Sequence, residues 1–252
     1  MELEVSGGEP GVALVTGGSR GIGRAIVRAL AHTGARVHFT FLQDRRKAEE
    51  TAKMVLDGGG TAEFSQLDVS EEAAVEAWSR SVLERERRLD ILVNNAGETV
   101  DGLLAFQETA DWRRVLAVNL DGTRHVCRAV LRTMIAQRRG RIVNLASVSA
   151  LMGLEGQTAY AAAKGGVLSF TRSLAREVAP FGITVNPLVP GPVETEMWKT
   201  LTEERRAALL SQVPLGRAAK PEEVAAAAVY LATDASSYVT GTSLRVDGGL
   251  SM

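Results

Sequence analysis

The 252-residue sequence predicts one α/β domain built on a doubly wound parallel sheet. Short apolar runs without polar alternation recur along the chain, as in strands that are covered on both faces. Segments with helical periodicity separate these runs, and the connections are short. A glycine-rich loop directly follows the first run and opens the first helix. We expect residues 11–252 to form this single domain and residues 1–10 to form a loose tail.

Composition and charge exclude several classes of function. The formal net charge is -1, so nothing in the charge favours nucleic acid or an anionic membrane as a partner. No apolar run approaches the roughly 20 residues of a membrane span, and the acidic N-terminal stretch is unlike a signal peptide. Cys127 is the only cysteine, which excludes an internal disulfide and suits a reducing cytosol. The three histidines show no metal-ligand spacing. We therefore expect a cytoplasmic protein without a metal site.

The first half of the sequence alternates strands and helices. We expect strands over residues 12–16, 36–41, 61–67 and 89–93, and helices over 24–33, 44–56 and 71–87. Asp68 closes the third strand with Val69, and its side chain either meets an adenine edge or caps the helix that starts near Glu71. Asn94-Asn95-Ala96-Gly97 ends the fourth strand. Small and polar residues at this end of a parallel strand suit a ligand crevice.

The second half continues the alternation. A long helix over 108–137 carries Asn119 within an apolar set. Further helices are expected over 159–179, with Thr158 as N-cap, and over 221–232, with Pro221 in its first turn. Strands are expected over 140–146, 182–188 and 243–246. The polar segment from Glu196 to about Gly216 is helical without a strong core face, which is typical of a mobile segment.

The glycine loop predicts a nucleotide site. Glycines let the backbone turn tightly and approach a pyrophosphate, whose charge then lies at the helix N-terminus. No carboxylate stands at the end of the second strand to hold ribose hydroxyls. Arg20 and Arg45 could instead receive a 2′-phosphate, which favours NADPH. Arg46 and Lys47 more simply open a solvated helix, and Asp44 keeps NAD(H) open.

Tyr160 and Lys164 are the chemically suggestive pair. They lie four residues apart in an alanine-rich helix and share one face. A tyrosine pKa of about 10 needs roughly 4 kcal/mol to reach about 7. One positive charge about 4 Å away supplies that much at an effective dielectric of about 20. Taken alone, this common spacing is better explained by a tyrosine packed under a lysine stem.

The full set of marks resembles the short-chain dehydrogenase/reductase family, and most closely its 3-oxoacyl-[acyl-carrier-protein] reductases and polyketide ketoreductases. The marks occur in the family's order over nearly the whole chain. They are the loop Thr16 to Gly23, Asn94 to Gly97, Asn119, Ser147, Tyr160-x-x-x-Lys164, Pro190-Gly191, Val193-Glu-Thr-Glu-Met197 and Val246-Asp-Gly-Gly249. The resemblance implies a seven-stranded parallel Rossmann sheet without a separate substrate domain.

The resemblance also implies residue roles. Ser147 would polarise a ketone oxygen, Tyr160 would donate the proton, and Lys164 would lower the tyrosine pKa and hold the nicotinamide ribose. Asn119 would anchor a water that passes protons to the lysine. The expected cofactor contacts are Gly17, Ser19, Arg20, Gly21, Ile22, Gly23, Asp68, Val69, Asn95, Ala96, Gly97, Tyr160, Lys164, Pro190, Gly191, Val193 and Thr195.

Three positions depart from the family pattern. Phe181 stands where such reductases often carry an arginine for docking acyl carrier protein, although Arg138 and Arg139 match a second basic spot. Pro187 removes a ladder donor, so we expect the sixth strand to end early and open the pocket. Glu98 replaces a small apolar residue, and we expect its side chain to point to water.

The expected function is NADPH-dependent reduction of a 3-oxoacyl thioester or similar ketone, with acyl carrier protein as a candidate partner. The mainly apolar residues Leu151, Met152, Leu154 and Gln157 and the stretch from Met197 to Leu201 would shape the substrate site. One alternative is an NAD(P)-dependent dehydrogenase of a sugar, steroid or other alcohol. Another is a protein that senses dinucleotide without turnover. The resemblance implies a homotetramer, with helices 108–137 and 159–179 paired between subunits.

Overall fold

The fold is a parallel sheet between two helical layers. The computed structural model describes residues 11–196, 198 and 202–252. Seven parallel strands form one sheet in the order β3-β2-β1-β4-β5-β6-β7, as the sequence predicts. The strands are β1 (Val12–Val15), β2 (Arg36–Phe41), β3 (Thr61–Gln66), β4 (Ile91–Asn94), β5 (Gly140–Leu145), β6 (Ile183–Pro190) and β7 (Leu244–Val246). The order reverses between β1 and β4, which opens a crevice at the carboxyl ends of these strands.

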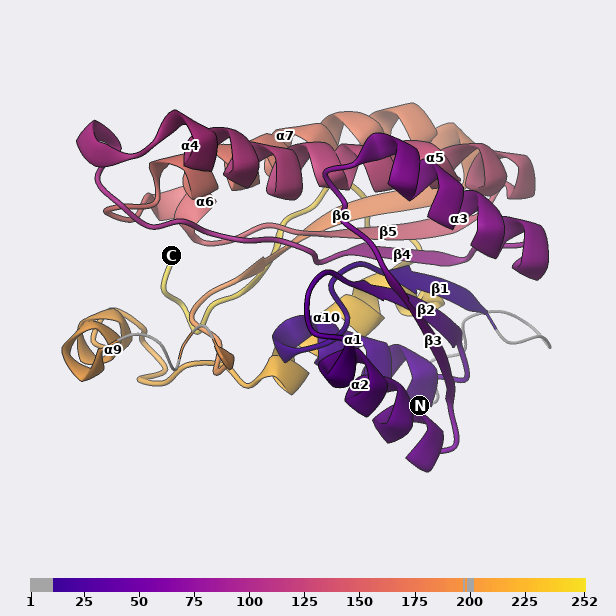
Figure 1. The fold of residues 1–252 in the computed structure, drawn as a ribbon, viewed down its shortest axis with the longest axis horizontal. Coiled ribbons are helices and arrows are strands. Elements are labelled where there is room, and N and C mark those ends of the chain that lie inside the picture. Colours follow the sequence, from indigo (N-terminus) through magenta and orange to yellow (C-terminus); the bar gives the residue numbers. More distant parts are fainter. Residues whose placement is uncertain (1–10, 197, 199–201) are drawn as a thin grey trace.

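The helices divide between the two faces of the sheet (Figure 1). One layer holds α1 (Gly21–His32), α2 (Arg45–Asp57) and α10 (Pro221–Ala232). The other holds α3 (Glu72–Glu86), α4 (Thr109–Leu116), α5 (Gly122–Gln137) and α7 (Thr158–Val178). The short α6 (Ser149–Met152) follows β5, and α9 (Glu203–Leu210) lies apart from both layers (Figure 1). Among the described residues, no helix combines the length and the apolar character that a membrane crossing requires.

The core forms because neighbouring strand residues face opposite layers. Ala13 and Val15 pack into a cluster with α1 and α10, whereas Val12 and Leu14 pack into a second cluster with α3, α5 and α7. All four residues are fully buried. This burial on both faces explains why β1 reads as a continuous apolar run.

Three predicted boundaries are wrong, each for a local reason. Helix α1 begins at Gly21, so the glycine loop supplies its first turn. Helix α7 begins at Thr158 itself, with Gln157 before it and no side-chain cap. Pro187 does not end β6, which continues to Pro190. Successive residues of a strand direct their backbone N–H and C=O groups to opposite sides. In β6, the carbonyl oxygens of Leu188 and Pro190 face the β5 side, where they accept hydrogen bonds from Ala146 and Val148. The missing N–H of Pro187 therefore faces away from β5.

The predicted tail and part of the predicted substrate-lining stretch cannot be compared. Residues 1–10, Met197 and residues 199–201 lie outside the described residues. Within the polar segment after β6, the structure describes α9, whose first turn is capped by the Thr202 side chain. Mobility of this segment stays a prediction.

Candidate active site

The glycine loop between β1 and α1 is built for close backbone approach. Gly17 and Gly21 adopt φ values of +67° and +53°, which L side chains rarely reach. A Cβ on Gly23 would lie 2.0 Å from the Gly17 carbonyl oxygen. Arg20 precedes α1 without a side-chain cap, so the first N–H groups of the helix are not used by a capping side chain. This concave, uncapped N-terminus fits a pyrophosphate.

Asn95 and Thr16 hold the shape of this loop. The Asn95 side-chain amide donates to the carbonyl oxygens of Thr16 and Gly17, both at 3.0 Å. The backbone N–H groups of Asn95 and Ala96 donate to the Thr16 hydroxyl, also at 3.0 Å. The Asn95 amide, predicted to line the cofactor, is thus used to join the end of β4 to the loop. Sequence reasoning gave Thr16 no role, because its contacts cross the sheet.

The strand ends around the loop bring other predicted residues together. A Cβ on Gly21 would lie 3.3 Å from Thr195 Cγ2, so the segment after β6 rests against the loop. Gly191 packs closely on Asp247, since a Cβ there would lie 2.8 Å from the Asp247 Cα. The backbone N–H of Gly191 donates to Val246 in β7. Direct contacts of Ser19, Ile22, Pro190 and Val193 with a cofactor stay predictions.

The expected roles of Asp68 and Asp44 change in the structure. Asp68 Oδ1 accepts hydrogen bonds from the backbone and hydroxyl of Ser70, at 3.0 and 2.6 Å. Glu71 is the N-cap position of α3, so Asp68 forms a local turn and is not the cap. Asp44 caps α2, accepting from the Lys47 N–H at 3.2 Å, and its carboxylate is thereby engaged. Val69 is buried next to this turn.

The two cations that meet beside the glycine loop are Arg20 and Lys47, whereas the sequence predicted Arg20 and Arg45. Arg45 lies 5.5 Å over the Phe64 ring and donates to Glu49. Lys47, interpreted from the sequence as a solvated residue, is 22% exposed and pairs with Glu196. Arg20 pairs with the same carboxylate at 3.0 Å. Arg20 and Lys47 therefore converge on one anion position, and sequence reasoning missed Lys47 because its direction depends on how α2 packs.

Ser147, Tyr160 and Lys164 meet at the carboxyl end of β5. Ser147 lies beside the Tyr160 hydroxyl, and its presence favours a lower pKa of the phenol. The Ser147 hydroxyl donates to the Ser149 hydroxyl at 3.1 Å. Lys164 lies one helical turn beyond Tyr160, donates to the Leu145 carbonyl oxygen at 2.8 Å, and lies 5.7 Å from the centre of the Tyr160 ring. The spacing in α7 thus gives the shared face that the sequence predicts.

The pKa of Tyr160 shifts in the direction opposite to the one expected from the sequence. Burial lowers the pKa of Lys164 to about 8, which weakens its positive charge near neutral pH. Burial raises the pKa of Tyr160 to about 12, against the influence of Ser147, and Asp101 adds to the rise. A lysine-lowered tyrosine pKa is therefore not a property of these protein groups alone. The sequence argument counted the charge and omitted the cost of desolvating both groups.

Asn119 is placed by a turn of π-helix, Ala117–Asp121, inside the long helix predicted over 108–137. Its amide donates to the carbonyl oxygens of Glu98 and Val115, at 2.7 and 2.8 Å. Its Oδ1 is buried and has no partner among the described residues. A Cβ on Gly97 would lie 2.6 Å from this oxygen and 3.5 Å from Lys164 Nζ. An unpaired buried oxygen beside an amine fits a bridging water.

Comparison with known proteins agrees with this geometry. A family model described as "Enoyl-(Acyl carrier protein) reductase" matches residues 17–251. The chain belongs to the short-chain dehydrogenase/reductase family. It is 45% identical to the 3-oxoacyl-[acyl-carrier-protein] reductase FabG of Vibrio harveyi, covering 96% of this chain and 97% of that one. It is 44% identical to the FabG of Escherichia coli K12, with the same coverage.

A solved structure extends the agreement to three dimensions. The crystal structure of gox2181 matches with a TM-score of 0.92 and 37% identity, covering 96% of each chain. These matches confirm the predicted family and the single Rossmann domain with seven parallel strands. The protein is an oxidoreductase of the short-chain dehydrogenase/reductase family, similar to the 3-oxoacyl-[acyl-carrier-protein] reductases.

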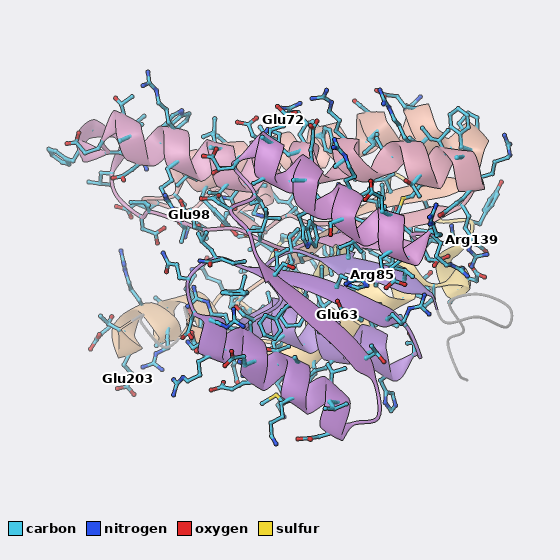
Figure 2. All side chains as sticks on the ribbon, turned by 45° about the vertical axis from the view of Figure 1, so that its right-hand side comes forward. Glu63, Glu72, Arg85, Glu98, Arg139 and Glu203 are labelled. Atoms are coloured by element: carbon cyan, nitrogen blue, oxygen red, sulfur yellow. The ribbon has the colours of Figure 1, made fainter. Side chains whose placement is uncertain are left out.

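The positions that depart from this family's pattern have definite partners. Glu98 (Figure 2) does not simply point to water, because it pairs with Arg114 of α4 at 2.6 Å. Phe181 is partly buried against the core cluster below α5 and α7. Arg139 pairs with Asp234 at 3.0 Å, and Arg138 donates to the Pro180 carbonyl oxygen. The basic spot at the end of α5 is thus tied to its own chain.

A chain of hydrogen-bonded polar side chains runs outward from Ser147, the predicted catalytic serine. The Ser149 hydroxyl donates to Gln157 Oε1 at 2.8 Å, and the Gln157 amide donates to Asp101 at 3.3 Å. Gln157 was expected to line an apolar substrate site together with Leu151 and Met152, which are indeed exposed at this surface. Ser149 and Asp101 carried no sequence signal, because Ser149 opens the short helix α6 and Asp101 lies in an irregular connection.

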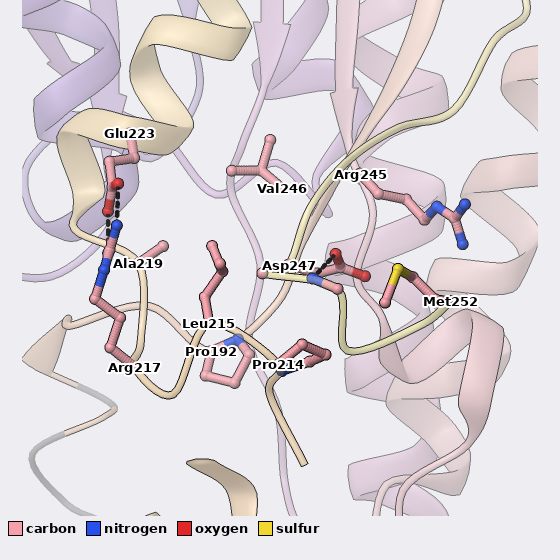
Figure 3. A pocket seen from close by; sticks show the side chains of 12 residues that line it. Pro192, Pro214, Leu215, Arg217, Ala219, Glu223, Arg245, Val246, Asp247 and Met252 are labelled. Carbon is pink, nitrogen blue, oxygen red and sulfur yellow. Dashed lines mark hydrogen bonds and ion pairs between the residues drawn. The ribbon is translucent and has the colours of Figure 1, made fainter. Parts of the chain in front are cut away.

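A separate cavity of about 430 Å³ lies beyond the exit of β6 (Figure 3). Pro192, Pro214 and Asp247 contribute to its wall, and Arg217 and Glu223 close one side through two hydrogen bonds of 2.7 Å. The predicted catalytic residues do not line it.

Proposed function

We propose that this oxidoreductase reduces a 3-oxoacyl thioester, or a similar ketone, to the secondary alcohol with NADPH. The observation that carries the proposal is the Tyr160 hydroxyl beside Ser147, one helical turn from Lys164. The relatives named as 3-oxoacyl-[acyl-carrier-protein] reductases support the substrate class. The pKa of Tyr160, raised to about 12, keeps its proton in place at neutral pH, as a proton donor in a reduction requires.

The chain's own residues divide the work. Ser147 and Tyr160 would each donate a hydrogen bond to the ketone oxygen, and Tyr160 would then transfer its proton to that oxygen. Lys164 would sit below the phenol, with the unpaired Asn119 Oδ1 positioned to hold a water near its Nζ. The nicotinamide, when bound over the glycine loop, would supply the hydride.

The preference for NADPH rests on Arg20 and Lys47. These two side chains converge beside the glycine loop and hold a carboxylate between them. A 2′-phosphate is an anion of the same kind with more charge and more acceptor oxygens. Asp44, the residue that kept NAD(H) open, is engaged as the cap of α2.

We further propose a cytoplasmic homotetramer that accepts its substrate free or bound to acyl carrier protein. The names of the relatives support the carrier, and the single, buried Cys127 suits a reducing compartment. Carrier docking would use Arg138 without an arginine partner at position 181, where Phe181 stands.

Turnover of acetoacetyl thioesters, free and carrier-bound, with each nicotinamide tests the proposal. We expect NADPH absorbance to fall with either substrate, and Tyr160→Phe to lower kcat by about 100- to 10,000-fold. Tyr230→Phe, at an exposed position of α10, is the matched control and should keep wild-type rates. Undiminished turnover by Tyr160→Phe, or none by the wild type with any ketone thioester, would refute the proposal.

A further inference from the structure

Glu196 occupies an unusual place beside the nucleotide loop. It follows Thr195, which rests against Gly21, and its carboxylate reaches two cations from distant parts of the chain. Glu196 Oε2 lies 3.0 Å from Arg20 Nη1, and Oε1 lies 2.5 Å from Lys47 Nζ. Each oxygen therefore binds a different cation. The hydrogen bonds from Lys47 and Arg20 hold the pKa of Glu196 below its usual range, which keeps it ionised.

The backbone segments that carry Arg20 and Lys47 are held together by contacts that do not involve Glu196. The Arg24 guanidinium donates to the Ser19 carbonyl oxygen at 2.8 Å and to the Lys47 carbonyl oxygen at 3.1 Å. The Thr51 hydroxyl is bonded to the same Ser19 oxygen at 3.0 Å. These contacts fasten the start of α2 to the glycine loop. Arg20 and Lys47 therefore extend from neighbouring backbone segments that are held together, and their side chains bind one anion, the carboxylate of Glu196.

We propose that Glu196 determines cofactor specificity, as an internal carboxylate that competes with the cofactor's 2′-phosphate for Arg20 and Lys47. The inference rests on the proposed use of NADPH and adds a residue to it. A 2′-phosphate carries about -1.5 to -2 charges and three acceptor oxygens, so it displaces a single carboxylate. A 2′-hydroxyl offers no such charge, so NADH binds with Glu196 still in place.

The competition lowers the affinity only for ligands that carry a 2′-phosphate. Glu196 is attached to the same chain, so it faces the cations at a high effective concentration. NADPH binding must break both ion pairs, and the displaced carboxylate then repels the phosphate. Glu196 therefore narrows the difference in affinity between NADPH and NADH.

Binding of matched ligands to Glu196→Gln tests the competition. Titration calorimetry would compare NADPH with NADH, and 2′-AMP with 5′-AMP, on the wild type and the variant. We expect the variant to bind NADPH and 2′-AMP about three- to tenfold more tightly, the range for two partly exposed ion pairs. Binding of NADH and 5′-AMP should stay the same. Glu203→Gln removes an equal charge from α9 (Figure 2), where no ion pair to Glu203 is found in the described residues.

The results separate two claims, the competition by Glu196 and the proposed use of NADPH. Equal or weaker 2′-AMP binding by Glu196→Gln would overturn the competition, as would an equal gain in Glu203→Gln or with 5′-AMP. If thioester turnover with NADPH stands in those cases, the proposed function survives. If the wild type shows no preference for 2′-AMP over 5′-AMP and turns over thioesters only with NADH, the proposed cofactor is wrong and the inference fails with it.

Discussion

At the scale of single residues, the burial of Lys164 at the candidate site lowers the stability of the folded protein. It is 3% exposed, and the Leu145 carbonyl oxygen is its hydrogen-bond partner among the described residues. An ammonium group buried without a counter-charge favours its neutral form, which is why its pKa falls to about 8. The amine is therefore kept at the site at the expense of stability near neutral pH.

Lys164→Met is expected to change how stability depends on pH. Between about pH 8 and 10.5 the unfolded chain holds the lysine proton and the folded chain does not. Wild-type stability therefore rises with pH in this window, by up to about 1.4 kcal/mol per unit, and the variant lacks that rise. Relative to the wild type, the variant should lose about 2 kcal/mol between pH 7.5 and 9.5 in urea unfolding. Tyr160 titrates higher, so it contributes little in this range.

The matched control is Lys53→Met, at an exposed position of α2. Lys53 lies 3.8 Å from Asp57 and its side chain is 76% exposed, so its removal should leave the pH slope of the wild type intact. An equal slope in wild type and Lys164→Met would show that the buried amine stays charged in the folded protein.

At the scale of elements, the π turn over 117–121 is the feature that sequence patterns could not predict. The apolar periodicity correctly indicates a long helix, but one extra residue in the backbone bonding hardly alters that pattern. The turn aims Asn119 at Gly97 and Lys164. The course of β6 through Pro187 was missed for a similar reason, because the direction of one N–H depends on register and not on composition.

Gly97→Ala should lower turnover through Asn119. The new Cβ would lie 2.6 Å from Asn119 Oδ1, and that amide is held in place by hydrogen bonds to the carbonyl oxygens of Glu98 and Val115. We expect kcat for a thioester to fall by about 10- to 100-fold. Steady-state kinetics with circular dichroism of the folded variant would measure this loss.

Gly102→Ala is the control for the same connection, because nothing lies within 4 Å of a Cβ built there. It should retain wild-type kcat. A Gly97→Ala enzyme as active as Gly102→Ala would show that the Asn119 oxygen has room to move and no fixed role.

At the scale of the whole molecule, the sequence predicted the layers, the strand count and the residues that gather at the crevice. Strand and helix periods report burial directly, which is why this part succeeded. Pairings between side chains that are far apart in the sequence could not be predicted. The pairing of Glu98 with Arg114, and of Lys47 with Glu196, joins elements whose relative placement no local pattern encodes.

The homotetramer stays a prediction about the outer face of α5 and α7. Ser169→Arg places a long cation at an exposed position of α7, where a second subunit would pack. In sedimentation velocity we expect the wild type to run as a tetramer and this variant to shift to smaller species. Ala73→Arg, at an exposed position of α3, should leave the tetramer intact. A monomeric wild type would contradict the prediction.

The contacts between Asn95 and Thr16 carry a consequence for engineering. They join the glycine loop after β1 to the end of β4 through backbone carbonyls and one hydroxyl. Hybrid enzymes that take β1 and its loop from this chain and β4 from a relative should keep the loop in place, provided that this threonine and this asparagine are both present.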